Sequence, residues 1–157
     1  MNTLARIQGA VTRTSARVDW LAPLLARLVV GSVFTLSGWG KLTHIDRTIA
    51  FFDSLGIPAP AFQAHLVGSI ELFGGLLLFA GLLSRAVAVP LAFTMVVAIA
   101  TAKWDDVHGI RDLLALEESQ LLVLAAWIAL AGPGRASLDE LIARRLQPKN
   151  ATKGERP

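Results

Sequence analysis

Two ionisable residues of opposite charge, Arg27 and Glu71, each interrupt a long apolar stretch of the 157-residue sequence. A charged side chain at the centre of a membrane helix costs about 2.5–3.5 kcal/mol on insertion scales, so such residues usually pair or serve a function. Counted at about 1.5 Å per residue, the depths of the two differ by only about 5–7 Å. We therefore expect an Arg27–Glu71 ion pair. Such a pair either locks two helices together or forms a polar pocket for a quinone head group or a proton.

A second group of ionisable residues gathers where apolar stretches end. It consists of Lys41, His44, His65, Lys103, His108, Glu117 and Glu118. Their spacing matches no zinc motif, and lysines at helix ends usually extend to water. This favours a solvated charge layer over a metal site, so no metal is expected. Lys41 joins Arg27 and Glu71 in the candidate cofactor-binding site, and no catalytic residue is assigned.

The composition places this site inside a membrane. Hydrophobic residues make up 54% of the chain and charged residues 17%, with no cysteine. Four stretches approach the roughly 20 apolar residues that a spanning helix needs. They cover residues 21–39, 61–83, 86–102 and 113–131, the last weakened by Glu117 and Glu118. The sequence predicts an all-α fold, a bundle of four transmembrane helices.

The segments outside the spans complete the organisation. Between the first two spans, Thr43 and Asp46 have the spacing of a capping box, and Gly56 can end the helix that follows. We expect a short amphipathic helix here, lying in the membrane interface; the alternative is a soluble loop helix that caps the bundle. Residues 1–20 form an N-terminal tail, 21–132 the membrane domain, and 133–157 a basic C-terminal tail.

The distribution of Lys and Arg predicts the orientation. Ten of the fifteen lie in the two tails and between the second and third spans, and four lie on the other side. Positive residues remain inside, so we expect a multi-pass protein of the cytoplasmic membrane with both termini in the cytoplasm. Trp20, Trp39, Trp104 and Trp127 all fall near span ends, where tryptophan is enriched.

Glycines predict which spans are neighbours. Gly31 and Gly38 share one face of the first span, and Gly68 and Gly75 share one face of the second. Small residues allow membrane helices to approach closely. We expect these two spans to be tight neighbours, with the Arg27–Glu71 pair inside their contact. The same glycines could instead leave room beside the charges for a quinone ring.

The sequence resembles the DoxX family of small four-helix membrane proteins. The resemblance rests on ARLVVGSVFTLSGWGKL at 26–42, FFDSLGIPAP at 51–60, GSIELFGGLLLFAGLLSR at 68–85 and GPGRASLDELI at 132–142. It marks Arg27, Gly31, Gly38, Lys41, Gly56, Pro58, Glu71, Gly74, Gly75, Gly81 and Arg85. It implies quinone-linked sulfur oxidation or membrane assemblies that respond to oxidative or thiol stress. Because the chain lacks cysteine, a partner or a bound quinone would have to carry any sulfur chemistry.

Three functions remain open at this point. The first is a membrane subunit of a quinone- or sulfur-linked redox assembly, which would make the chain an oxidoreductase component and not a stand-alone enzyme. The second is a non-catalytic anchor or assembly factor that recruits a cytoplasmic partner, and the third is a small transporter or proton path. Expected partners are the lipid bilayer, a cytoplasmic or membrane redox protein, and a second copy of the chain. Nucleic acid is not expected, because the basic residues lack aromatic interleaving.

Overall fold

The computed structural model describes residues 20–146. The predicted N-terminal tail, apart from Trp20, and the last part of the basic tail lie outside the described residues. Within residues 20–146 the regular secondary structure is entirely helical, which confirms the all-α prediction.

Four long helices form the body of the molecule. They are α2 (Leu21–Thr43), α4 (Pro60–Ala80), α5 (Ser84–Ala98) and α7 (Glu117–Ala131). Short elements connect or follow them: α3 (Ile45–Ser54), the π-helix η1 (Ile99–Lys103), the 3₁₀-helix η2 (Trp104–Asp106), α6 (Ile110–Ala115) and α8 (Leu138–Leu146).

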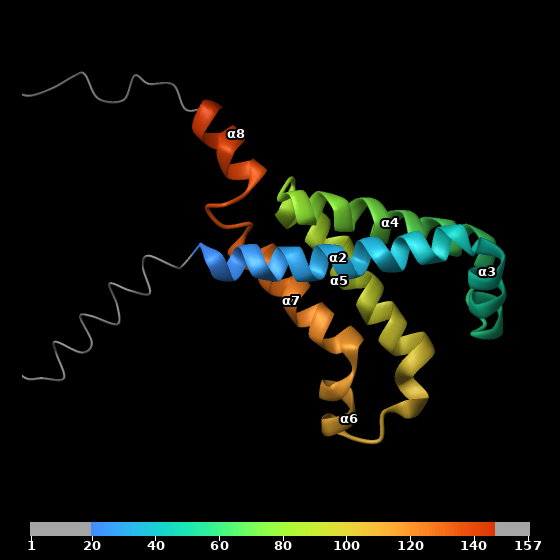
Figure 1. Cartoon of the computed structure of the whole chain (residues 1–157). Coiled ribbons are helices and arrows are strands. Elements are labelled where there is room, and N and C mark those ends of the chain that lie inside the picture. Colours follow the sequence, from blue (N-terminus) through green and yellow to red (C-terminus); the bar gives the residue numbers. More distant parts are fainter. Residues whose placement is uncertain (1–19, 147–157) are drawn as a thin grey trace, which may run out of the picture.

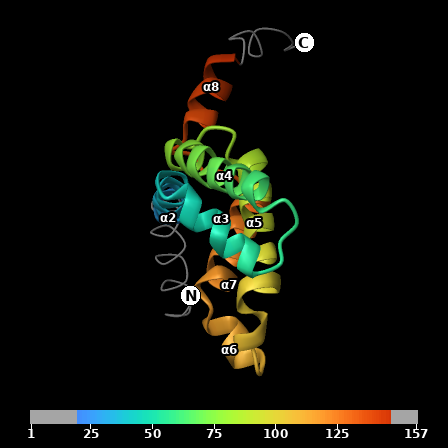
Figure 2. The same ribbon diagram turned by 90° about the vertical axis from the view of Figure 1, so that its right-hand side faces the viewer.

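The long helices pack as two antiparallel pairs. Helices α2 and α4 lie side by side, and α5 and α7 form a second pair that is inclined to the first (Figure 1). In Figure 2 the second pair lies below α2 and α4. We call the end of the α2–α4 pair next to α3 the α3 end. The opposite end, from which α8 extends, is the α8 end.

Three of the four predicted spans are long and apolar enough to cross a membrane. They are Leu21–Thr43, Pro60–Ala80 and Ser84–Asp106, the last of which continues from α5 through η1 and η2. The fourth stretch differs from the prediction, because Leu116 is extended (φ −63°, ψ 136°) and separates α6 from α7. Helix α7 has 15 residues and begins at Glu117, so a fourth crossing by this segment stays a prediction.

The predicted amphipathic helix between the first two spans exists as α3, but it begins differently. Thr43 is the last residue of α2, where its hydroxyl donates to the Trp39 carbonyl at 2.8 Å. His44 is the N-cap of α3, and no side chain caps it. The capping-box prediction was therefore wrong. Gly56 follows α3 with φ +69°, the left-handed backbone that glycine adopts without strain.

One apolar core joins the two pairs. Its buried residues come from all four long helices: Val30, Phe34, Leu78, Ala88, Leu91, Met95, Leu121 and Ile128. Elsewhere many large apolar side chains face outward, among them Leu36, Phe62, Phe93 and Leu130. A lipid solvent imposes no cost on such exposure, so this surface agrees with a membrane-embedded bundle.

Candidate functional site

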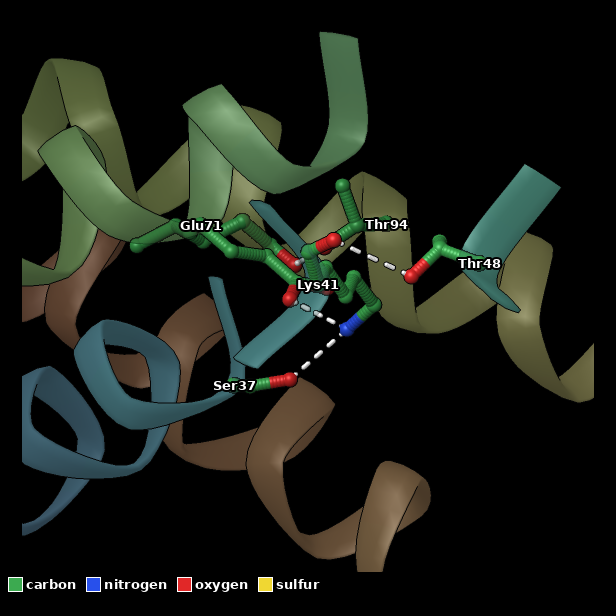
Figure 3. Close-up of polar contacts among 6 residues, drawn as sticks. Ser37, Lys41, Thr48, Glu71 and Thr94 are labelled. Atoms are coloured by element: carbon green, nitrogen blue, oxygen red, sulfur yellow. Dashed lines mark hydrogen bonds and ion pairs between the residues drawn. The ribbon is translucent and has the colours of Figure 1, made fainter. Parts of the chain in front are cut away.

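Lys41 and Glu71 form an ion pair between α2 and α4 near the α3 end (Figure 3). Lys41 Nζ lies 2.5 Å from Glu71 Oε2. The Glu71 side chain is 2% exposed, whereas that of Lys41 is 27% exposed. The Glu71 carboxylate is thus buried within the bundle, whereas the Lys41 side chain reaches the surface of the bundle. A carboxylate removed from water requires such a partner, because an unpaired buried charge is strongly destabilising.

Neighbouring hydroxyl groups hold Lys41 in place. Its Nζ also donates to Ser37 Oγ at 2.7 Å, one helical turn earlier on α2. From α3, Thr48 Oγ1 donates to the Lys41 carbonyl at 3.1 Å and so ties α3 to the end of α2. Figure 3 shows the ammonium group between Ser37 and Glu71. The site is therefore assembled from three consecutive helices.

The predicted Arg27–Glu71 pair is wrong, because Glu71 bonds to Lys41 instead. Side chains on a helix lean toward its N-terminus. Glu71 on α4 therefore leans toward the α3 end, whereas Arg27 on α2 leans toward the α8 end. Arg27 packs against Gly81, ten residues beyond Glu71, which corresponds to about 15 Å along α4. The three predicted site residues thus divide into a Lys41–Glu71 pair and a separate Arg27.

Backbone contact closes the space between α2 and α4, as the glycine spacing predicted. A methyl group added at Gly31 would lie 2.7 Å from the Phe79 amide nitrogen, and one at Gly75 would lie 2.5 Å from the Thr35 nitrogen. A methyl at Gly38 would lie 2.7 Å from the Gly68 carbonyl oxygen. The alternative, in which these glycines leave room for a quinone ring, is therefore wrong for this interface.

Arg27 belongs to a second polar cluster at the α8 end. Its side chain is 1% exposed, and its Nη2 donates to the Ala136 carbonyl. Within residues 20–146 no acceptor reaches its Nε or Nη1. The guanidinium lies against the backbone of Gly81, and Asp139 is the carboxylate that interacts with it electrostatically. The segment that follows α7 therefore covers this buried cation.

Asp139 fixes that segment to the turn between α4 and α5. Its carboxylate accepts hydrogen bonds from the backbone amides of Leu83, at 2.8 Å, and Ser84, at 3.0 Å. Its own amide donates to the Gly81 carbonyl at 3.0 Å. A carboxylate at these amides satisfies donors that the first turn of α5 leaves free. Asp139 thus caps α5 from a different helix, which the sequence analysis did not foresee.

The remaining predicted charges form no compact site. Lys103 Nζ and Glu118 Oε1 are 4.0 Å apart across η1 and α7. His44, His65 and His108 each bond to a carbonyl on their own segment. In the part of the chain that the structure describes, no three His, Asp or Glu side chains lie close enough to hold a metal ion.

The Lys41–Glu71 pair is the site that can take an external acceptor. A lysine ammonium has three N–H donors, of which Ser37 and Glu71 use two. Among residues 20–146 no third acceptor bonds to Lys41, and its side chain is partly exposed. The remaining N–H is therefore available to an acceptor from outside residues 20–146. Arg27 has unused donors as well, but the backbone of Gly81 and the segment after α7 enclose them.

Comparison with known proteins identifies relatives over most of the chain. The family model described as DoxX matches residues 22–104. "Putative oxidoreductase CatD" of Bacillus subtilis is 41% identical over 83 residues, which cover 53% of this chain and 60% of that relative. The aligned part thus spans about three fifths of that relative's length.

Two further relatives match over longer stretches. "Uncharacterized membrane protein Rv3486" of Mycobacterium tuberculosis is 36% identical over 135 residues, 76% of this chain and 80% of the relative. "Inner membrane protein YqjF" of Escherichia coli is 29% identical over 130 residues, which cover 82% of this chain and 98% of the relative. No solved structure matches this sequence.

Proposed function

Because this chain belongs to the DoxX family of integral membrane proteins, we propose that it is the membrane subunit of a redox assembly, with a quinone site at Lys41. One observation carries the proposal: a partly exposed ammonium group is held by a buried carboxylate and retains an unused donor. The name of the Bacillus subtilis relative, which calls that protein a putative oxidoreductase, is consistent with this role.

Each residue of the site has a distinct task in this proposal. Lys41 Nζ donates a hydrogen bond to a ring carbonyl oxygen and would stabilise the negative charge that develops on it during reduction, while water at the exposed side of Lys41 would supply the two protons. Glu71 Oε2 and Ser37 Oγ hold the ammonium in position. A bound quinone supplies the capacity to take up two electrons and two protons. The electrons come from a partner redox protein, because the chain has no cysteine for thiol exchange.

Quinone retention by the purified protein tests this function. We expect the unmodified protein, extracted from its membrane in mild detergent, to carry quinone, and Lys41→Met to lose most of it. Lys103→Met is the matched control, because Lys103 is also a partly exposed lysine and its carboxylate lies 4.0 Å away. Absence of quinone from the unmodified protein, or equal retention by Lys41→Met, would contradict the proposal.

A second candidate, the non-catalytic anchor, is favoured by the tight α2–α4 packing. The glycines bring the two backbones into contact, and the ion pair then acts only to fix their register. This reading predicts that the double variant Lys41→Met, Glu71→Gln keeps the cellular function of the protein. The redox proposal predicts its loss.

The proposal also includes an orientation of the chain relative to the two sides of the membrane. We propose that the α8 end faces the cytoplasm and that the Lys41–Glu71 pair lies toward the outer surface, following the excess of Lys and Arg in the tails. A reporter fused after Pro157 should be active in the cytoplasm, and one inserted at Gly109 should be active outside. A C-terminus on the outer side would overturn both this orientation and a fourth crossing by α7.

A further inference from the structure

Helix α8 contacts the rest of the molecule with its polar side. Asp139, Glu140 and Ala143 line a shallow groove together with residues of the turn and first part of α5, including Leu83 and Ala86. Asp139 provides the hydrogen bonds that hold this contact, and Ser137 Oγ accepts from the Glu140 amide at 3.1 Å to cap the helix. A helix of a water-soluble domain normally turns its apolar side toward the protein.

The apolar side of α8 points away from the bundle. Leu138, Leu141 and Ile142 fall on one face of the helix and are 43%, 55% and 46% exposed. Their positions, with spacings of three and four residues, form a continuous stripe. In both views α8 extends away from the paired helices (Figures 1 and 2). Residues 20–146 therefore leave about half of this stripe uncovered.

The depth and the charge of α8 indicate what covers it. In Figure 1 α2 runs roughly horizontally, and α8 lies above its N-terminal part. Along the axis of α2, α8 is therefore near the start of the first membrane span, which begins at Leu21. Arg144 and Arg145 occupy its last turn. From Arg144 to Pro157 the sequence holds five basic residues and one acidic residue. An apolar stripe beside a basic segment at the edge of a bilayer is the pattern of a helix that binds anionic lipid.

We propose that α8 is a lipid-binding helix, which inserts Leu138, Leu141 and Ile142 at the membrane surface and contacts anionic phospholipid head groups with Arg144 and Arg145. The contacts of Asp139 with the turn between α4 and α5 hold the helix at this level. The bundle thus spans the bilayer, while α8 lies at the surface of the leaflet next to the α8 end.

The charges of α8 favour lipid over an acidic protein partner or a second copy of the chain. Asp139 is held by backbone amides, and Glu140 pairs with Arg144 at 2.9 Å. This pair is exposed and of a kind worth less than about 1 kcal/mol, so Arg144 can turn to a phosphate group, and Arg145 adds a second positive charge. The stripe and the basic end therefore present apolar groups and positive charge together. A two-fold dimer with its two α8 helices parallel would place the basic ends of both copies close to each other, which is unfavourable. Anionic lipid matches both features.

Spin labelling of the full chain can test the position of the stripe. Because the sequence has no cysteine, Leu141→Cys or Ile142→Cys introduces a single attachment site. Ala143→Cys, at an exposed position on the opposite side of the helix, is the matched control. Each labelled protein is placed, one copy per nanodisc, in bilayers of either purely zwitterionic lipid or zwitterionic lipid mixed with phosphatidylglycerol. Collision rates are measured with oxygen, which concentrates in lipid, and with a water-soluble nickel chelate.

We expect labels at positions 141 and 142 to collide mainly with oxygen in the anionic nanodiscs, and the label at 143 to collide mainly with the chelate. Replacing Arg144 and Arg145 by glutamine should shift the labels at 141 and 142 about tenfold toward the water-exposed population in anionic lipid. Water exposure of these labels in anionic nanodiscs would overturn the proposal. So would protection from both reagents, which would indicate a protein contact. If the labels at 141 and 142 were equally buried in lipid in zwitterionic and in anionic nanodiscs, the assignment of Arg144 and Arg145 to anionic head groups would be wrong.

Discussion

The two ends of α2 each hold a basic side chain, and the structure neutralises them differently. At the α3 end, Lys41 meets the carboxylate of Glu71 from the adjacent helix and remains partly exposed. At the α8 end, Arg27 is enclosed, bonds to the Ala136 carbonyl and lies near Asp139, both from the segment after α7. The α3 end thus has a partly exposed ion pair with one unused N–H donor. The α8 end has a buried arginine that connects α2 to the segment carrying α8.

This difference assigns separate roles to Arg27 and Glu71, the two residues that the sequence had suggested as partners. Breaking the Lys41–Glu71 pair should affect ligand binding and the packing of two adjacent helices. Disturbing Arg27 should instead release the segment that carries α8. The tightly packed glycines between the ends keep the two clusters apart, so a change at one end should leave the other largely intact.

The largest effect is expected from the packing that separates the two ends. Gly38→Ala would place a methyl group 2.7 Å from the Gly68 carbonyl oxygen and closer still to the Leu72 amide, both of which are backbone atoms. Forcing the helices apart should lower the free energy of unfolding by about 3 kcal/mol. Unfolding of the purified protein in mixed micelles measures this change. Gly40→Ala is the control, because no atom lies within 4 Å of its added methyl group, and it should have no destabilising effect.

A smaller effect, limited to the α8 end, is expected from Gly81→Ala. Gly81 has φ +74°, and an added methyl group would collide with the guanidinium of Arg27. The strain and the displaced arginine should together cost about 2 kcal/mol. Protease cleavage after Arg144 or Arg145 should become faster, while quinone retention at Lys41 stays unchanged.

Gly56→Ala separates the two causes of that effect. Gly56 also has a positive φ, +69°, but no atom lies within 4 Å of an added methyl group. This variant should show only the backbone strain, about 1 kcal/mol. Equal destabilisation by Gly56→Ala and Gly81→Ala would mean that Arg27 is not enclosed at Gly81.

A still smaller effect is expected from Asp139→Asn. The amide oxygen can replace only one of the two hydrogen bonds that Leu83 and Ser84 donate, and the favourable charge at the start of α5 disappears. We expect a loss of about 1 kcal/mol in the free energy of unfolding. Asp53→Asn, at an exposed position on α3, should change it by less than about 0.5 kcal/mol.

Much of the fold could be predicted because apolar length and glycine spacing are local properties of the sequence. Three spans and the contact of α2 with α4 follow from them. The break at Leu116 could not be predicted in this way, because neither glycine nor proline marks it. Helix α8 was missed because it lies within a segment that was read as a basic tail. Its signal was present in the capping sequence from Ser137 to Glu140.

The candidate site could be predicted only in part, because depth along two helices does not determine which side chains meet. Lys41 and Glu71 lie together, but the predicted Arg27–Glu71 pair was wrong, and the role of these residues in cofactor binding stays a prediction. Gly31 opposite Gly75 fixes the register, and the lean of side chains toward each helix N-terminus then directs Glu71 to Lys41 and Arg27 away from it. The contact of Arg27 with Ala136 depends on residues 109 positions apart, which no spacing rule relates.

Two double-mutant cycles that share Glu71 test most directly whether the Lys41–Glu71 pair and Arg27 are energetically independent. The first combines Glu71→Gln with Lys41→Met, and the second combines Glu71→Gln with Arg27→Met, with the free energy of unfolding measured for every variant. Because Lys41 is partly exposed, we predict a coupling of about 1–2 kcal/mol for the first cycle, and a value within about 0.5 kcal/mol of zero for the second. A larger coupling of Glu71 to Arg27 than to Lys41 would contradict the account.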